Sequence, residues 1–234
     1  MFGSSSWIPR GVLCAVAVAA TLVVADASAQ SSRYADPGLF TIARLHYSGG
    51  GDWYSNQSSL PNLLAELERR TGVRTMEREA IVTLDDERLF SYPMLYATGH
   101  GIMRPIVSDL DRLRTWLDQG GFLWVDDNYG IDDSFRDTVQ RLYPEGELVP
   151  LDGDHPIYSA WYELPGLPKV HEHDGLPAQG YGLFDSGRMK IFYSFSSDIG
   201  DGLEDPEVHG DGADLREAAM RMAINVCWFA LTQS

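Results

Sequence analysis

The sequence has very little cysteine. Its 234 residues include two, Cys14 and Cys227, and Cys14 falls within an apolar stretch at the amino terminus. If that stretch is removed, only Cys227 is left, and no intramolecular disulfide can form. A small disulfide-stabilised scaffold is therefore excluded, and stability must come from packing. We expect Cys227 to be buried in a carboxy-terminal helix.

Positive charge is also scarce. There are 18 Lys and Arg residues against 34 Asp and Glu residues, and the formal net charge is −16. Nucleic acids and anionic membrane surfaces would repel such a chain, so we expect neither as a partner. A small polar ligand or an envelope protein is the partner that we expect instead.

The apolar run at the amino terminus is too short to cross a bilayer. Residues 11–24 would make about 21 Å of helix, against a hydrocarbon core of about 30 Å. Arg10 precedes the run, and the small residues 27–29, Ala-Ser-Ala, follow it. This pattern predicts a secretory signal peptide over residues 1–29, cleaved before Gln30. We therefore expect a periplasmic or secreted protein with no stable membrane insertion.

The rest of the chain alternates between apolar runs and amphipathic stretches. The length of residues 30–234 suits one domain with a substantial core. Alternating strand-like and helix-like segments are typical of an α/β domain. We expect strands at residues 40–47, 94–98, 122–125 and 190–195, and helices at residues 61–68, 106–118, 133–143 and 215–231.

Polar and aromatic residues gather where these expected strands end. In open parallel sheets, ligands bind in the crevice beyond the carboxyl ends of the strands. We therefore expect one cleft whose candidate ligand-binding residues are Asp52, Trp53, Tyr54, His100, Asp126, Asp127, Asn128, Asp198, Asp201 and Glu204. Aromatic rings beside acids are typical of sugar-binding clefts, but they also serve as lids over a core.

Three of these residues are candidates for catalysis: His100, Asp126 and Asp127. Glycines on both sides of His100 let the backbone approach a substrate closely. His100 is a general base, a ligand, or a residue that only shapes the turn. Neighbouring carboxylates repel one another unless they are solvated, protonated or bridged by a cation or a polyhydroxylated ligand. All of these alternatives stay open at this point.

The segment HEHDG contains the candidate metal ligands His171, His173 and Asp174. Two imidazoles with one or two carboxylates suit zinc, iron or manganese, so a divalent metal is a candidate cofactor. The alternatives are a polar loop whose histidines pair with local carboxylates, and acid/base groups that work without metal. Because the acids at the strand ends need cationic partners, we expect this segment to fold back over the cleft.

Several phrases of the chain resemble a known family. They are FTIARLHYSGGGDWY, LPNLL, LFSYPMLYATGHG, GGFLWVDDNYGIDDSFR, DHPIY and YSFSSDIGDGLED, in matching order over residues 39–231. On these phrases the chain resembles the bacterial domain of unknown function 4159. That family is similar to the class I glutamine amidotransferase-like superfamily, which includes the ThuA-like proteins. The resemblance implies a three-layer, flavodoxin-like α/β fold, with a mostly parallel sheet of about five or six strands flanked by helices.

The same resemblance implies a cysteine nucleophile on a strand-to-helix turn. The matching turn is residues 98–101, Thr-Gly-His-Gly, where His100 stands instead of cysteine. Acyl transfer through a thiolate is therefore not expected. We expect a non-catalytic envelope module that binds a polar ligand or a partner. The alternative is a metal- or carboxylate-assisted hydrolase acting on an envelope sugar or amide.

Overall fold

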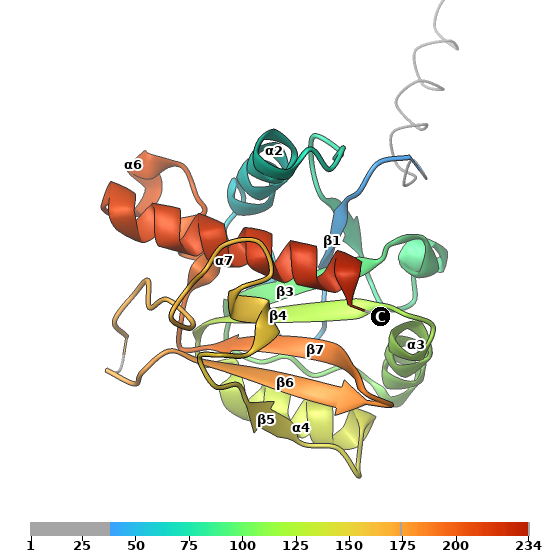
Figure 1. The fold of residues 1–234 in the computed structure, drawn as a ribbon. Helices are drawn as coiled ribbons and strands as arrows, with labels where there is room; N and C mark the ends of the chain where they lie inside the picture. The colour runs from blue at the N-terminus through green and yellow to red at the C-terminus, as the bar shows by residue number, and fades with distance from the viewer. Residues whose placement is uncertain (1–37, 174, 234) are drawn as a thin grey trace, which may run out of the picture. The chain divides into compact units, whose positions relative to one another are not determined.

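The structure is a computed structural model that describes residues 38–173 and 175–233 (Figure 1). The predicted signal peptide and Asp174 lie outside the described residues. Within them, no helix combines the length and the apolar character needed to span a membrane. In chain order the elements are β1 (Ile42–Leu45), α2 (Ser59–Thr71), β2 (Ala80–Val82), η1 (Glu87–Ser91), β3 (Met94–His100), α3 (Val107–Asp118), β4 (Phe122–Tyr129), α4 (Asp132–Leu142), β5 (Leu148–Pro150), η2 (Pro156–Tyr158), β6 (Gln179–Asp185), β7 (Arg188–Phe195), α5 (Ile199–Gly202), α6 (Pro206–His209) and α7 (Ala213–Thr232).

These strands form one sheet in the order β2-β1-β3-β4-β7-β6-β5. The first five strands in this order are parallel. At the β7 edge, β6 pairs antiparallel with β7, and β5 pairs antiparallel with β6. The parallel part has the flavodoxin-like strand order, with a switch point between β1 and β3 where the chain reverses direction across the sheet. The sheet has seven strands where five or six were expected. The sequence of β6 contains Gly180 and Gly182, and glycine inside a strand weakens the apolar alternation that marks one.

Helices cover both faces of the sheet and give the predicted three-layer α/β fold. Helices α2 and α7 pack on one face, around Trp124 and Phe192. Helices α3 and α4 pack on the other face, around Leu123 and Tyr193. Cys227 is fully buried in α7, as expected.

Helix α3 ends where the sequence predicts, whereas α2, expected at residues 61–68, spans Ser59–Thr71. Helix α3 stops before Gly120, whose φ of 110° only glycine adopts readily. Helix α2 ends on Gly72, which has a φ of 77°. The stop after α3 lies close to the start of β4 at Phe122.

Strand β4 runs further than the sequence predicts. Asp126 and Asp127 were expected in a loop, but they pair with Thr98 and Gly99 of β3 and are still part of the strand. Because alternate residues of a strand point to opposite faces, the two neighbouring aspartates lie on different sides of the sheet. Asp126 lies on the α7 side with Trp124, and Asp127 lies on the other side.

The acidic run after β7 is not a solvated loop. It contains the single helical turn α5, and its acids are largely buried: relative exposure is 0 % for Asp198 and 7 % for both Asp201 and Glu204. The turn sits on the edge of the sheet because its backbone amides bond to Asp126. Because these carboxylates are buried, the surrounding side chains must compensate their charge.

Candidate functional site

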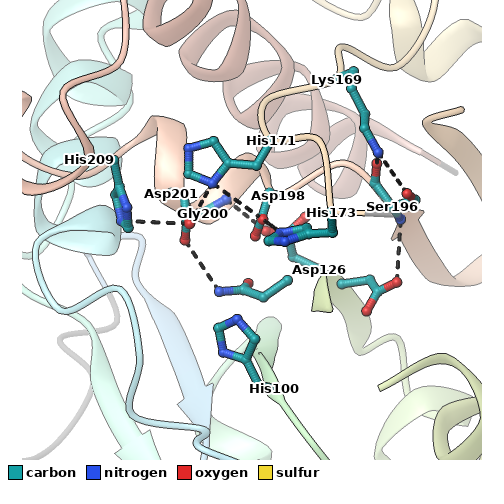
Figure 2. Close-up of polar contacts among 12 residues, drawn as sticks. His100, Asp126, Lys169, His171, His173, Ser196, Asp198, Gly200, Asp201 and His209 are labelled. Atoms are coloured by element: carbon teal, nitrogen blue, oxygen red, sulfur yellow. Dashed lines mark hydrogen bonds and ion pairs between the residues drawn. The ribbon is translucent and has the colours of Figure 1, made fainter. Parts of the chain in front are cut away.

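Histidines and acids converge at the carboxyl edge of the parallel strands (Figure 2). Of the six histidines in the chain, His100, His171, His173 and His209 meet there. They come from the end of β3, from the loop before β6 and from α6. Their rings are neighbours: the ring centroids of His171 lie 6.1 Å from those of His173 and 5.2 Å from those of His209.

His171 lies at the centre of this group and has carboxylates on both ring nitrogens. Its Nε2 is 3.1 Å from Asp211 Oδ1, and its Nδ1 is 2.9 Å from Asp201 Oδ2 and 3.5 Å from Asp198 Oδ2. An ionised carboxylate can only accept hydrogen bonds, so Nε2 must carry the hydrogen that faces Asp211. The side of His171 that faces Asp198 and Asp201 then holds either a second proton or a cation.

His173 lies over the carboxyl end of β4. Its Nε2 contacts Asp198 Oδ2, and its ring stacks on Tyr129 with centroids 5.1 Å apart. Burial, followed by the neighbouring charge of His171, lowers the pKa of His173. The imidazole is therefore held in its neutral form, which is the form that binds metals.

His209 completes the group, and the sequence interpretation did not select it. Its Nε2 lies 3.3 Å from Glu204 Oε2 and 3.6 Å from Asp201 Oδ2. Glu204 also accepts hydrogen bonds from the backbone N–H and the hydroxyl of Ser58. The only sequence signal for His209 and Asp211 is that both follow the acidic run within a few residues.

Asp126 forms the floor of the site. It is fully buried and accepts hydrogen bonds from the hydroxyls of Tyr96 and Ser194 and from the backbone N–H groups of Ile199 and Gly200. Burial raises its pKa to about 7 in spite of these donors. With every oxygen engaged, Asp126 holds α5 in place and is not available to a substrate.

Asp198 is the most strained acid of the site. Its backbone is left-handed, with a φ of 65°, and its carboxyl group is fully buried. Burial first, and then Asp201, Asp126 and Asp127, raise its pKa to about 10. Within the described part of the chain its Oδ1 has no hydrogen-bond partner. Its other oxygen, Oδ2, faces His171 and His173, so the carboxylate combines an unpartnered oxygen with one that two imidazoles approach. Such a buried group would be stabilised by a cation.

Asp127 faces a separate cavity of about 310 Å³ next to His173. Its Oδ2 accepts a long hydrogen bond of 3.4 Å from the backbone N–H of Ser196, and its Oδ1 has no partner among the described residues. Burial raises the pKa of Asp127. Asp132 and Asp133 also line this cavity, which is therefore acidic.

His100 lies near His173 and forms a pair with Asp52. Its Nδ1 lies 3.1 Å from Asp52 Oδ2, and its backbone N–H donates to Asp52 Oδ1. The ring centroids of His100 and His173 are 6.5 Å apart. The loop after β1 and the end of β3 are thus joined at the switch point of the sheet.

Asn128 and the aromatic residues Trp53 and Tyr54 were also expected in the cleft. Asn128 is buried and donates from Nδ2 to Asp201 Oδ1 over 3.2 Å. Trp53 stacks on His46 with ring centroids 4.0 Å apart, and Tyr54 packs edge-on against Trp53. Trp53 and Tyr54 thus make ring contacts with His46 and with each other, and they make none with the rings of the histidine group.

A larger cavity, of about 420 Å³, lies between α2, the end of α5 and α7, and none of its described lining residues is a histidine. Its charged side chains pair with one another, as Arg70 does with Glu66 and Glu217. The cavity that borders the histidine group is the smaller one, beside His173.

Two overlapping sets of side chains could hold a metal ion. One is His171, His173 and Asp198, and the other is His171, Asp201 and His209; within each set the ligand atoms lie within 4.8 Å of one another. Two ligands bound to one metal at about 2.1 Å are themselves about 3.0 to 3.5 Å apart. The separation of 3.5 Å between His171 Nδ1 and Asp198 Oδ2 falls in this range, and that of 2.9 Å to Asp201 Oδ2 lies just below it. His173 and Asp198 are closer together and would have to move apart.

Comparison with known proteins identifies the family but no activity. The family model described as Domain of unknown function (DUF4159) matches residues 41–231. The chain belongs to this family. No curated protein matches the chain.

Proposed function

We propose that this member of the DUF4159 family binds one divalent transition-metal ion at the carboxyl edge of its sheet and uses it to hold a polar ligand. The observation that carries the proposal is the environment of His171. Its Nε2 is oriented by Asp211, while its Nδ1 faces two carboxylates at 2.9 and 3.5 Å. Metal-binding histidines typically donate their second N–H to a carboxylate in this way.

The charge balance supports the same proposal. Asp198 and Asp201 are buried side by side, and Asp126 lies beneath them. The nearby ammonium group of Lys169 is engaged by the carbonyl oxygens of Leu176 and Ser196 and by the Ser196 hydroxyl. Buried carboxylates without a strong counter-charge are costly, and a divalent cation would remove that cost.

The donor set favours a transition metal over calcium or magnesium. Imidazole nitrogens suit zinc, iron, cobalt and nickel, whereas calcium and magnesium take oxygen ligands. With His171, His173 and Asp198 as ligands, coordination positions remain for a ligand from the 310 Å³ cavity. This arrangement agrees with a module that recognises a small polar molecule.

A metal-binding measurement tests the proposal. We expect the purified domain, stripped with chelator and reloaded with Zn²⁺ or Co²⁺, to retain one equivalent by elemental analysis. His171→Ala should weaken retention at least tenfold because it removes the central ligand. The matched control is His46→Ala, since His46 is exposed and stacks on Trp53 outside the group.

The competing explanation is a protonated His171 that forms ion pairs with Asp201 and Asp211. In that case the wild-type domain would bind no more metal than His171→Ala. Equal retention by the two proteins would therefore refute the metal proposal.

We further propose that the domain acts in the bacterial envelope after removal of residues 1–29. The support is the apolar leader with its Ala-Ser-Ala end. Intact-mass analysis of protein taken from the periplasmic fraction should give a chain that starts at Gln30. A full-length chain retained in the membrane fraction would contradict this.

A further inference from the structure

The His100–Asp52 pair has the geometry of an oriented proton acceptor. Asp52 accepts from Nδ1 of the ring and from the backbone N–H of the same residue, so both the position and the tautomer of His100 are fixed. Asp52 N–H in turn donates to the backbone carbonyl of His100 over 3.1 Å. With the hydrogen on Nδ1, Nε2 keeps a lone pair, and it has no hydrogen-bond partner in the described part of the chain.

Glycines make this close approach feasible. A Cβ on Gly99 would lie 2.7 Å from Asp52 Oδ1, and a Cβ on Gly51 would lie 2.8 Å from the carbonyl oxygen of His100. The two loops can meet only because these positions have no side chain. His100 itself keeps half of its side chain exposed, so a substrate can reach it.

His100 faces the histidine group that we propose as the metal site (Figure 2). Its ring is perpendicular to that of His173, with centroids 6.5 Å apart. That separation is too long for a direct hydrogen bond and leaves room for one water molecule on a metal held by His173. The pair also stands at the switch point between β1 and β3, where ligands of such sheets bind.

We propose that the domain is a hydrolase of neutral or cationic carboxylic esters or amides, in which His100, positioned by Asp52, accepts the proton of a metal-bound water. This inference rests on the proposed metal site. The water oxygen attacks the carbonyl carbon while its proton passes to His100 Nε2. The C–O or C–N bond of the tetrahedral intermediate then breaks, and the leaving alcohol or amine takes that proton. One water is consumed, and a carboxylic acid and an alcohol or amine are released.

The cavity beside His173 sets the substrate class. Three aspartates, Asp127, Asp132 and Asp133, line it, and none of its described lining residues is Lys or Arg. A phosphate ester would meet these carboxylates without a cationic side chain to bind it. A neutral acyl group that carries hydroxyl or ammonium donors fits, because the carboxylates that line the cavity can accept hydrogen bonds from it.

The test uses Co²⁺-loaded, full-length mature protein with p-nitrophenyl acetate as the neutral ester probe. We expect hydrolysis above that of the metal-free protein. His100→Ala should lower kcat about 100-fold or more, the usual contribution of a general base. Asp52→Asn should lower kcat about tenfold and leave KM unchanged, since Asp52 only positions the base. His46→Ala and Asp85→Asn are the matched controls and should change neither.

A second readout does not depend on turnover. Acetohydroxamate chelates a metal after it loses a proton, so a nearby base favours its binding. We expect it to change the Co²⁺ absorption spectrum of the wild-type protein, with affinity at least tenfold weaker in His100→Ala. Metal stoichiometry should stay the same in both proteins, which separates a lost base from a lost metal.

Each outcome has a separate meaning. Absence of metal from the wild-type protein overturns the metal site and this inference together. A protein that holds metal but does not hydrolyse the ester overturns only the hydrolase. Full activity in His100→Ala refutes the role of His100, and faster cleavage of bis(p-nitrophenyl) phosphate than of the ester refutes the substrate class.

Discussion

Replacing Asp198 by asparagine should stabilise the metal-free domain and abolish its response to metal. Asparagine has nearly the same shape as aspartate, and it tolerates the left-handed backbone of this position, where φ is 65°. Its amide can donate to His173 Nε2, which now contacts Asp198 Oδ2. The substitution therefore removes a buried charge without removing the contact.

The magnitude follows from the pKa of Asp198. Burial and the neighbouring acids raise it from 3.8 to about 10, so at pH 7 the carboxyl group must take up a proton on folding. At a pH below the folded-state pKa, each pH unit above the unfolded-state pKa of 3.8 costs about 1.4 kcal/mol. This sets an upper limit of about 4 kcal/mol at pH 7. Because this is an upper limit, we expect a gain of about 1 to 3 kcal/mol, or a melting temperature about 3 to 10 °C higher.

The stability difference between Asp198→Asn and wild type should depend on pH. A carboxyl group whose pKa is raised in the folded state favours folding fully below pH 3.8, and this contribution is lost as the pH rises towards 10. The difference between Asp198→Asn and wild type should therefore be small at pH 4.5 and large at pH 8. Asp85→Asn, at an exposed position, is the matched control and should show no such trend.

Thermal melts with and without Zn²⁺ provide the assay. Wild type should gain about 2.7 kcal/mol when free metal is at 100 times the dissociation constant, and Asp198→Asn should gain much less. A metal-free variant that is less stable than wild type at pH 8 would refute the argument from buried charge. A variant with an undiminished metal shift would remove Asp198 from the ligand set.

Three further predictions concern the scaffold. Arg70→Met should lower the free energy of unfolding by about 1 kcal/mol in urea titrations, because Arg70 joins α2 to Glu217 of α7 through two hydrogen bonds of 2.8 and 2.9 Å. Glu217 is too exposed for a larger effect, and an unchanged urea midpoint would contradict the prediction. Gly200→Ala should cost about 1 to 3 kcal/mol in thermal melts, since its Cβ would lie 2.5 Å from Tyr96 Oη, and a neutral result would show that the turn can shift. Burial lowers the pKa of His155 below 6.5, so the folded state loses stability as the pH falls below that value. His155→Asn keeps an acceptor for the Ile157 N–H and should remove this loss in thermal melts at pH 5 and 7. Identical pH profiles for the variant and wild type would contradict the prediction.

Much of the fold is predictable from local sequence patterns. Helix α3 was expected at residues 106–118 and is found at Val107–Asp118, because its apolar spacing and its glycine stop are both local signals. Strand β6 was missed because its glycines interrupt the alternation. The end of β4 was misplaced because Asp126 and Asp127 look like loop residues, and only their pairing with β3 keeps them in the strand.

The site was less predictable because its side chains come from distant parts of the chain. His171 and Asp201 are 30 residues apart in sequence, yet their polar atoms lie 2.9 Å apart. The rule that ligands bind at the carboxyl ends of parallel strands indicates the right edge of the sheet. It does not indicate that Asp127 faces away from Asp126, or that His209 on the short helix α6 turns towards Asp201.

The end of β3 carries a histidine, His100, and no cysteine. The resemblance to the amidotransferase-like proteins implies a thiolate on this turn, but the only cysteine among the described residues, Cys227, is buried in α7, where burial raises its pKa far above the usual range. A covalent thiolate intermediate therefore has no residue to form it at this edge. His100 is instead oriented by Asp52 to accept a proton, and the nucleophile must then be a small molecule such as water. Water is a weak nucleophile at neutral pH unless a metal lowers its pKa, and the nearest group that could hold a metal is the one around His171 and His173. In the hydrolase that we propose, the base at His100 and the histidine group would therefore serve the same step.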